Sequence, residues 1–408
     1  MITEFTLAGA LVGGYNYIIS NKRKIKKIIK DTLENNNLDY KVINIENTEN
    51  GYKVIISLYG VGFEKLENAK DLLESSLGSY VEIQQNENIK TATIYVIEEK
   101  LTDSYKYSSV TVKPYELFIG KTYTLKDVIL NMQDLPHCLF SGINSSGKTL
   151  CMVTALVNLI HFNSSRDIEL FLAQVSAKKD LRKFKDIKQC RGYANNLVKA
   201  YDMFQYLYHT MEKRISMFNG IKSKYVDDIY EWNRAFPKRK MRVIYLAMDE
   251  FTSYMPDSLD SKEDAELKTK CLDLLVKLIQ QSRCTGIYVL ASLQRPDKES
   301  LPPRLKAQFN CKVSFKQSNI ASSLVVTDSE KAFNLRPKRE AIVNADEEYL
   351  VKTLYIDNKM IKDILEPYID MEHKNYYNYK KEILKETKPL PEVEPKKKKS
   401  KSRVKICI

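Results

Sequence analysis

One octapeptide limits the folds open to this chain more than any other stretch. Its glycines, lysine and threonine have the spacing of a P-loop, and it consists of Gly142, Ile143, Asn144, Ser145, Ser146, Gly147, Lys148 and Thr149. The glycines let the backbone turn tightly and point successive N–H groups at a polyphosphate. Lys148 is expected to reach the β- and γ-phosphates of ATP, and the Thr149 hydroxyl to ligate Mg²⁺.

The flanks of this loop match a P-loop as well. Residues 137–140 form a short apolar run suited to a buried strand. After the loop, apolar side chains recur at helical spacing, at Leu150, Val153, Leu156, Val157 and Ile160. A strand, a glycine loop and a helix N-terminus together place a phosphate on the helix dipole. The sequence therefore predicts an α/β fold with a nucleotide site at residues 142–149.

A second stretch carries two adjacent acids. Residues 243–248 are six apolar residues, followed directly by Asp249 and Glu250. A central parallel strand that delivers carboxylates to a nucleotide site has this pattern. Asp249 is expected to hold Mg²⁺ and Glu250 to polarise the attacking water. The alternative is a strand that ends in a solvated acidic turn, and the upstream P-loop favours the site.

A third candidate follows the apolar run 286–292. Gln294 comes two residues after the end of this predicted strand, where a polar side chain can sense the γ-phosphate. The alternative is an ordinary loop glutamine. Further apolar patterns predict a strand at 168–175, a long helix from Leu197 and a helix at about 264–283.

Composition narrows the class of protein without naming a partner. The 408 residues suggest two to three domains, and the net charge of +13 is concentrated near the two ends. Once residues 21–30, residues 387–408 and Glu4 are set aside, the remaining chain carries a charge of +2, so no broad basic DNA groove is expected. The seven cysteines form no C-x-x-C pair, which favours reduced thiols in the cytoplasm over a zinc site.

The remaining segments predict the domain order. Residues 1–35 combine an apolar stretch at 5–19 with a basic run, the order of a membrane anchor with its positive side in the cytoplasm. The alternative is a segment that packs on the protein or docks with a partner. Residues 36–115 predict a small α+β subdomain, and residues 371–408 a polar helix and a flexible Lys-rich tail.

Several motifs together resemble the FtsK/SpoIIIE family of hexameric, ATP-driven double-stranded DNA translocases. Pro136-His137 stands before the P-loop strand, and Asp249-Glu250-Phe251 is followed by Met255. The matching stretches are Gln280-Gln281-Ser282-Arg283-Cys284-Thr285-Gly286, Gln294-Arg295-Pro296 and Glu212-Lys213-Arg214. All of these motifs occur in the family's order, and the similarity covers roughly residues 50–345.

The resemblance implies a working model. It predicts a RecA-like P-loop motor at residues 116–370 with a mostly parallel central sheet, assembled into a homohexameric ring around double-stranded DNA. ATP would lie between subunits, with Lys148, Thr149, Asp249 and Glu250 from one subunit. An arginine of the next subunit would stabilise the γ-phosphate charge, and Arg214 and Arg283 are both candidates.

Departures from the family narrow the expectation and leave alternatives open. Gln174-Val175-Ser176 replaces the family's Asp-Pro-Lys, and nothing after residue 345 is long enough for a DNA-orienting winged helix. The absent winged helix points to a relative that serves a plasmid, an integrative element or a phage. The basic segment after a short apolar N-terminus resembles the conjugative branch, at the inner face of the cell membrane with a relaxosome or transfer machinery as partner. Two alternatives remain: a type VII-like protein-secretion ATPase, and a nucleotide-binding adaptor without motor activity.

Overall fold

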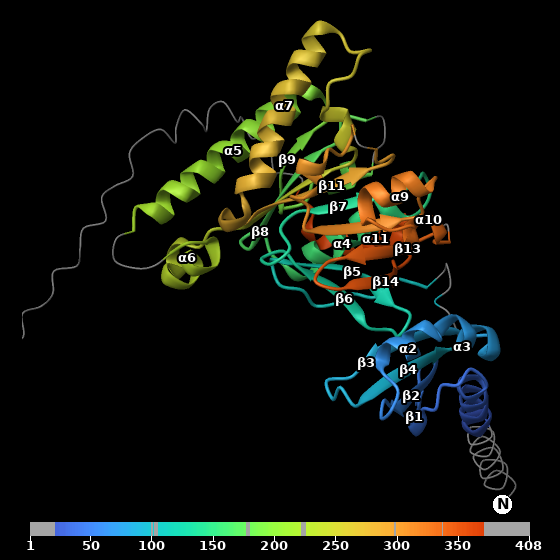
Figure 1. The fold of residues 1–408 in the computed structure, drawn as a ribbon. Coiled ribbons are helices and arrows are strands. Elements are labelled where there is room, and N and C mark those ends of the chain that lie inside the picture. The colour runs from blue at the N-terminus through green and yellow to red at the C-terminus, as the bar shows by residue number, and fades with distance from the viewer. Residues whose placement is uncertain are drawn as a thin grey trace, which may run out of the picture.

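The computed structural model describes residues 21–98, 101, 105–176, 180–221, 226–297, 299–336 and 338–370. Its strands form two sheets, one of four strands and one of ten. The smaller sheet belongs to a subdomain that lies at one end of the larger α/β unit (Figure 1). The predicted fold class, an α/β unit preceded by a small α+β subdomain, is therefore confirmed.

The small subdomain is an antiparallel sheet covered by helices. Its strand order is β1-β2-β4-β3, and the elements are β1 (Lys41–Thr48), β2 (Gly51–Ser57), α2 (Phe63–Asn68), α3 (Lys70–Leu77), β3 (Tyr80–Gln85) and β4 (Thr91–Ile97). Residues 21–35 are helical, and Ile25, Ile29 and Leu33 are buried against this sheet. These three residues share one helix face, and that face packs into the hydrophobic core of the small subdomain. The predicted boundary at residue 35 would therefore separate this helix from the core that it contacts.

The ten-stranded sheet has a parallel centre and an antiparallel extension. Its order is β6-β5-β14-β13-β12-β7-β11-β10-β8-β9, and the strands from β12 to β9 are parallel. The strands are β5 (Glu116–Thr122), β6 (Asp127–Asn131), β7 (Cys138–Ser141), β8 (Ile168–Ala173), β9 (Cys190–Ala194), β10 (Val243–Met248), β11 (Ile287–Leu293), β12 (Cys311–Phe315), β13 (Glu340–Asn344) and β14 (Glu348–Lys352). Every residue of β7, β8, β10 and β11 is buried, as expected for strands covered on both faces.

Helices cover both faces of the parallel strands. One face packs on α4 (Lys148–Phe162) and α11 (Asn358–Leu365), and the other on the long pair α5 (Leu197–Asn219) and α7 (Lys262–Gln281) (Figure 1). The shorter helices are α6 (Ile229–Ala235), α8 (Pro303–Lys306), α9 (Ile320–Thr327) and α10 (Lys331–Asn334), with 3₁₀ turns η1 (Leu181–Phe184), η2 (Pro237–Arg239), η3 (Phe251–Tyr254), η4 (Arg283–Thr285) and η5 (Glu366–Tyr368). This arrangement directs the carboxyl ends of the central strands to one edge of the sheet.

The segment before β5 belongs to the core of the larger α/β unit. The Tyr107 hydroxyl donates to Asn158 Oδ1 at 2.8 Å, and Val112 is buried in the same cluster as α4. The predicted boundary at residue 115 therefore differs from the packing, because Asn158 is a buried polar residue that needs these partners. The small subdomain contacts the larger unit through Asn50 Nδ2, which donates to the Tyr123 carbonyl at 2.6 Å.

Two predictions fall on residues outside the described ranges: the apolar segment 5–19 and the tail 371–408. Among the helices of residues 21–370 that are described, none has the length and apolar character needed to cross a bilayer.

Candidate nucleotide-binding and hydrolysis site

The P-loop joins the end of β7 to the start of α4, as the sequence predicts. Gly142 and Gly147 have φ angles of 147° and 112°, which residues other than glycine rarely adopt. A Cβ on Gly142 would lie 2.7 Å from Phe315 Cβ, and one on Gly147 would lie 2.8 Å from Arg339 Cγ. Both glycines are thus required by backbone conformation and by close neighbours.

The loop is held from three sides by main-chain hydrogen bonds. Gly142 N donates to the Leu293 carbonyl at 3.3 Å, and Ile143 N donates to the Lys316 carbonyl at 3.0 Å. The Ser146 carbonyl accepts from Arg339 N at 2.6 Å. Asn144 and Ser145 remain exposed at the loop's tip. These bonds fix the loop before any ligand binds, so little ordering is left to oppose phosphate binding.

The acidic strand end meets the P-loop. Strand β11 lies between β7 and β10, so the ends of all three parallel strands share one edge of the sheet. Lys148 Nζ lies 3.8 Å from Glu250 Oε2, and these two side chains are only 5% and 14% exposed. At an effective dielectric constant of about 20, charges at this distance attract by about 4 kcal/mol. Two segments a hundred residues apart in sequence thus converge on one electrostatic site.

Asp249 is almost completely buried, with 1% of its surface exposed. Its Oδ2 accepts a hydrogen bond from the Ser176 hydroxyl at 2.7 Å, while its Oδ1 has no hydrogen-bond partner among the described residues. A buried carboxylate oxygen without a partner is costly unless a cation satisfies it. The donor set of Asp249 and the Thr149 hydroxyl, both hard oxygen ligands, therefore fits Mg²⁺.

Gln294 lies between the acids and the P-loop. Its main-chain N donates to Glu250 Oε1 at 3.2 Å, and its side-chain amide donates to Asn144 Oδ1. The Thr252 hydroxyl donates to the same Glu250 oxygen at 3.2 Å. The structure thus brings Gln294, Glu250 and the P-loop together, and a γ-phosphate-sensing role for Gln294 stays a prediction.

Arg214 and Arg283 lie at the opposite edge of the sheet, before the amino ends of β10 and β11. Arg214 is 8% exposed and donates to the Thr285 carbonyl at 2.5 Å and the Arg242 carbonyl at 2.9 Å. Burial lowers the pKa of Arg214 to about 10. These contacts argue against the predicted trans role for Arg214, since its guanidinium is used to tie the sheet to α5. Arg283 is exposed and donates from Nε to the Gln133 carbonyl at 3.1 Å.

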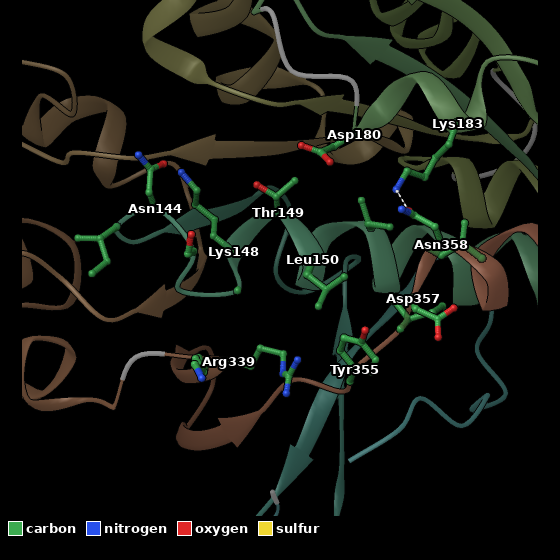
Figure 2. Close-up of a pocket in the computed structure, with 17 residues that line it drawn as sticks. Asn144, Lys148, Thr149, Leu150, Asp180, Lys183, Arg339, Tyr355, Asp357 and Asn358 are labelled. Atoms are coloured by element: carbon green, nitrogen blue, oxygen red, sulfur yellow. Dashed lines mark hydrogen bonds between the residues drawn. The ribbon is translucent and has the colours of Figure 1, made fainter. Parts of the chain in front are cut away.

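A cavity of about 670 Å³ opens beside the P-loop (Figure 2). Asp249, Glu250 and Gln294 are not among its lining residues, but Lys148 and Asn144, which contact Glu250 and Gln294, are. Its apolar wall includes Leu150, Val153, Tyr355, Ile356 and Ile361, a surface suited to a nucleobase.

Charged side chains from distant segments also line this cavity, and the sequence motifs do not include them. They are Asp180, Lys183, Lys338, Arg339 and Asp357. Lys183 Nζ donates to Asn358 Oδ1 at 3.3 Å, and burial lowers the pKa of Lys183. No local sequence pattern predicts these residues, because they come from three segments that are far apart in the sequence.

Comparisons with known proteins agree with the motifs. No family model matches the chain. DNA translocase FtsK of Caldanaerobacter subterraneus subsp. tengcongensis is 24% identical over 383 residues, which cover 90% of this chain and 51% of that protein. DNA translocase FtsK of Chlamydia muridarum is 25% identical over 267 residues, which cover 61% of this chain and 32% of that protein. The chain thus spans about half the length, or less, of these curated relatives.

Solved structures share the fold. The pCW3 conjugation coupling protein TcpA, in a monomer form with ATPγS, superposes with a TM-score of 0.61 at 16% identity over 84% of this chain and 99% of that one. EssC (ATPases 2 and 3) of Geobacillus thermodenitrificans gives a TM-score of 0.55 at 15% identity, covering 66% and 51%. The chain is therefore related in sequence to DNA translocases named FtsK and has the fold of P-loop ATPases of the FtsK/SpoIIIE type.

Proposed function

We propose that this chain is an ATP-driven double-stranded DNA translocase of the FtsK/SpoIIIE type. The observation that carries the proposal is the convergence of Lys148 and Glu250 at 3.8 Å, with Gln294 contacting both Glu250 and Asn144. A phosphate-binding loop beside a carboxylate that can polarise water is the minimum needed to hydrolyse a nucleoside triphosphate. The names of the FtsK relatives support DNA as the polymer that is moved.

The residues divide the work of hydrolysis between them. The P-loop N–H groups and Lys148 bind the β- and γ-phosphates, and Lys148 exchanges its contact with Glu250 for a phosphate oxygen. Glu250 then faces the attacking water as general base, held by Gln294 N and the Thr252 hydroxyl. Asp249 and Thr149 would hold Mg²⁺, which when bound would supply a Lewis acid that withdraws charge from the phosphate oxygens.

The assembly we propose is a homohexameric ring with ATP between subunits. Arg283 is exposed on the edge of the sheet away from its own P-loop, which suits an arginine that acts on a neighbour's nucleotide. DNA would pass through the ring and be held by a few phosphate contacts, because the body of the chain is nearly neutral.

The finer setting we propose is conjugative or other mobile-element transfer, at the inner face of the membrane and beside a relaxosome or transfer machinery. The likeness of fold to a conjugation coupling protein over 84% of the chain supports this choice. Likeness to the type VII secretion ATPase EccC of Thermomonospora curvata is also one of fold, so an experiment must separate DNA from polypeptide as the polymer that is moved.

Displacement of a third strand from triplex DNA tests the motor directly. The full chain with MgATP is expected to release the triplex-forming oligonucleotide from linear duplex, whereas Lys148→Ala is not, since it lacks the phosphate-binding ammonium. A wild-type chain that hydrolyses ATP without displacing the strand would contradict translocation. Stimulation of hydrolysis by a polypeptide in place of DNA would indicate secretion.

A further inference from the structure

A short loop before β13 lies directly against the P-loop. Lys338 and Arg339 have φ angles of 82° and 69°, a left-handed conformation that such side chains seldom adopt. Arg339 N donates to the Ser146 carbonyl at 2.6 Å, and a Cβ on Gly147 would lie 3.0 Å from Arg339 Cα. Unfavourable backbone conformations of this kind gather at ligand-binding sites, where surrounding contacts maintain them.

The same loop is fixed from its other side. The Arg339 carbonyl accepts from Thr353 N at 2.9 Å, and the Lys338 carbonyl accepts from Lys352 Nζ at 3.0 Å. Glu340 accepts from Arg336 N at 3.0 Å through Oε2. Its Oε1 accepts from the Tyr123 hydroxyl at 2.5 Å. These bonds hold the conformation that carries the Arg339 side chain to the cavity.

The Arg339 side chain lines the cavity beside the P-loop. Its Cζ is 5.1 Å from the centre of the Tyr355 ring, and both side chains line the cavity next to Leu150 (Figure 2). Four cationic side chains and two acidic ones line this cavity, namely Lys148, Lys183, Lys338, Arg339, Asp180 and Asp357. The excess of positive charge complements a polyphosphate.

We infer that Arg339 binds the phosphates of the nucleotide held by its own P-loop. It is a ligand supplied in cis, separate from the arginine that a neighbouring subunit would supply. A guanidinium suits this task, because its planar array of donors can grip phosphate oxygens while it stacks on Tyr355. The inference rests on the proposed function, and it gives the strained loop a reason to approach the P-loop so closely.

Binding of Mg·ATPγS, ADP and adenosine to Arg339→Gln, measured by calorimetry, tests the inference. Glutamine keeps the main-chain bond to Ser146 but removes the charge. Loss of charge-assisted hydrogen bonds to phosphate is expected to weaken Mg·ATPγS binding by about 10- to 100-fold. Adenosine affinity and the melting temperature should not change, and Arg339→Lys should restore part of the ATPγS affinity.

Arg336→Gln is the matched control, because Arg336 is exposed in the same loop and does not line the cavity. It should bind all three ligands like the wild type. The inference is wrong if Arg339→Gln binds Mg·ATPγS as the wild type does. It is also wrong if ATPγS and adenosine weaken equally, which would indicate a purely supporting role. Failure of the proposed function would look different, since wild type and Lys148→Ala would then bind ATPγS alike.

Discussion

Replacing Glu250 with glutamine tests the division of labour in the site. The substitution keeps the shape of the side chain and an oxygen that can accept from Gln294 N and the Thr252 hydroxyl. It removes the negative charge that faces Lys148 Nζ at 3.8 Å and the capacity to take a proton from water. Binding and hydrolysis should therefore respond in opposite directions.

The expected magnitudes follow from the geometry. Loss of a general base lowers a hydrolysis rate by about 10²- to 10⁴-fold. In the wild type, the phosphates must compete with a Lys148–Glu250 attraction of about 4 kcal/mol at an effective dielectric constant of about 20. If only a third of that energy is released in Glu250→Gln, ATP binds about tenfold more tightly.

The assay pairs equilibrium binding of Mg·ATPγS with phosphate release at saturating ATP. Glu263→Gln on the first turn of α7 is the control, because it removes the same charge from an exposed position. That control should match the wild type in both measurements. A Glu250→Gln protein that releases phosphate within threefold of the wild-type rate refutes the assignment. Tenfold weaker nucleotide binding refutes the electrostatic argument.

Two further predictions concern the half-buried Ser176 and the buried His137. Ser176→Ala removes the hydroxyl that orients Asp249. The affinity for Mn²⁺ in the presence of ADP, measured by electron paramagnetic resonance, should therefore fall by about 10-fold or more, whereas Ser176→Thr should retain it. Equal Mn²⁺ affinities of wild type and Ser176→Ala would contradict that role. Burial lowers the pKa of His137 to about 3. Below about pH 6.5 the unfolded chain therefore binds a proton at this histidine that the folded chain does not bind. The free energy of unfolding should consequently fall by about 2 kcal/mol between neutral pH and pH 5. Denaturant unfolding of His137→Gln should show a flatter pH dependence than wild type or the exposed-site variant His161→Gln, and three equal slopes would contradict it.

The core of the site could be predicted because its signals are local. The glycine spacing of the P-loop and the acids after an apolar strand depend on neighbours within a few residues. The strand–loop–helix arrangement then follows from periodicity alone. Parallel strands also align their carboxyl ends, which explains why Lys148 and Glu250 were expected to meet.

The rest depends on contacts between distant segments. Ser176 stands where the family has a different residue, and only the structure places its hydroxyl against Asp249. Arg339 reaches Gly147 through a left-handed backbone that no motif records. The Glu212-Lys213-Arg214 motif predicted a catalytic role for Arg214. The burial of its guanidinium and its hydrogen bonds to two carbonyls depend on tertiary packing, which the motif does not record.

The packing of two further segments also depends on contacts that composition does not record. The helix over residues 21–35 is strongly basic, and its charges conceal the stripe of Ile25, Ile29 and Leu33 that packs on the small sheet. Residues 105–115, which the sequence assigns to the small subdomain, supply partners to the buried Asn158. Composition describes the surface of such segments better than their buried side.

The most direct test of the account is steady-state ATP turnover by the full chain, with and without linear duplex DNA, at low and moderate salt. We expect turnover that requires Lys148 and rises with DNA, and we expect the DNA effect to shrink at the higher salt, because contacts with phosphates release counterions. Turnover that is indifferent to duplex DNA at both salt concentrations would contradict the account.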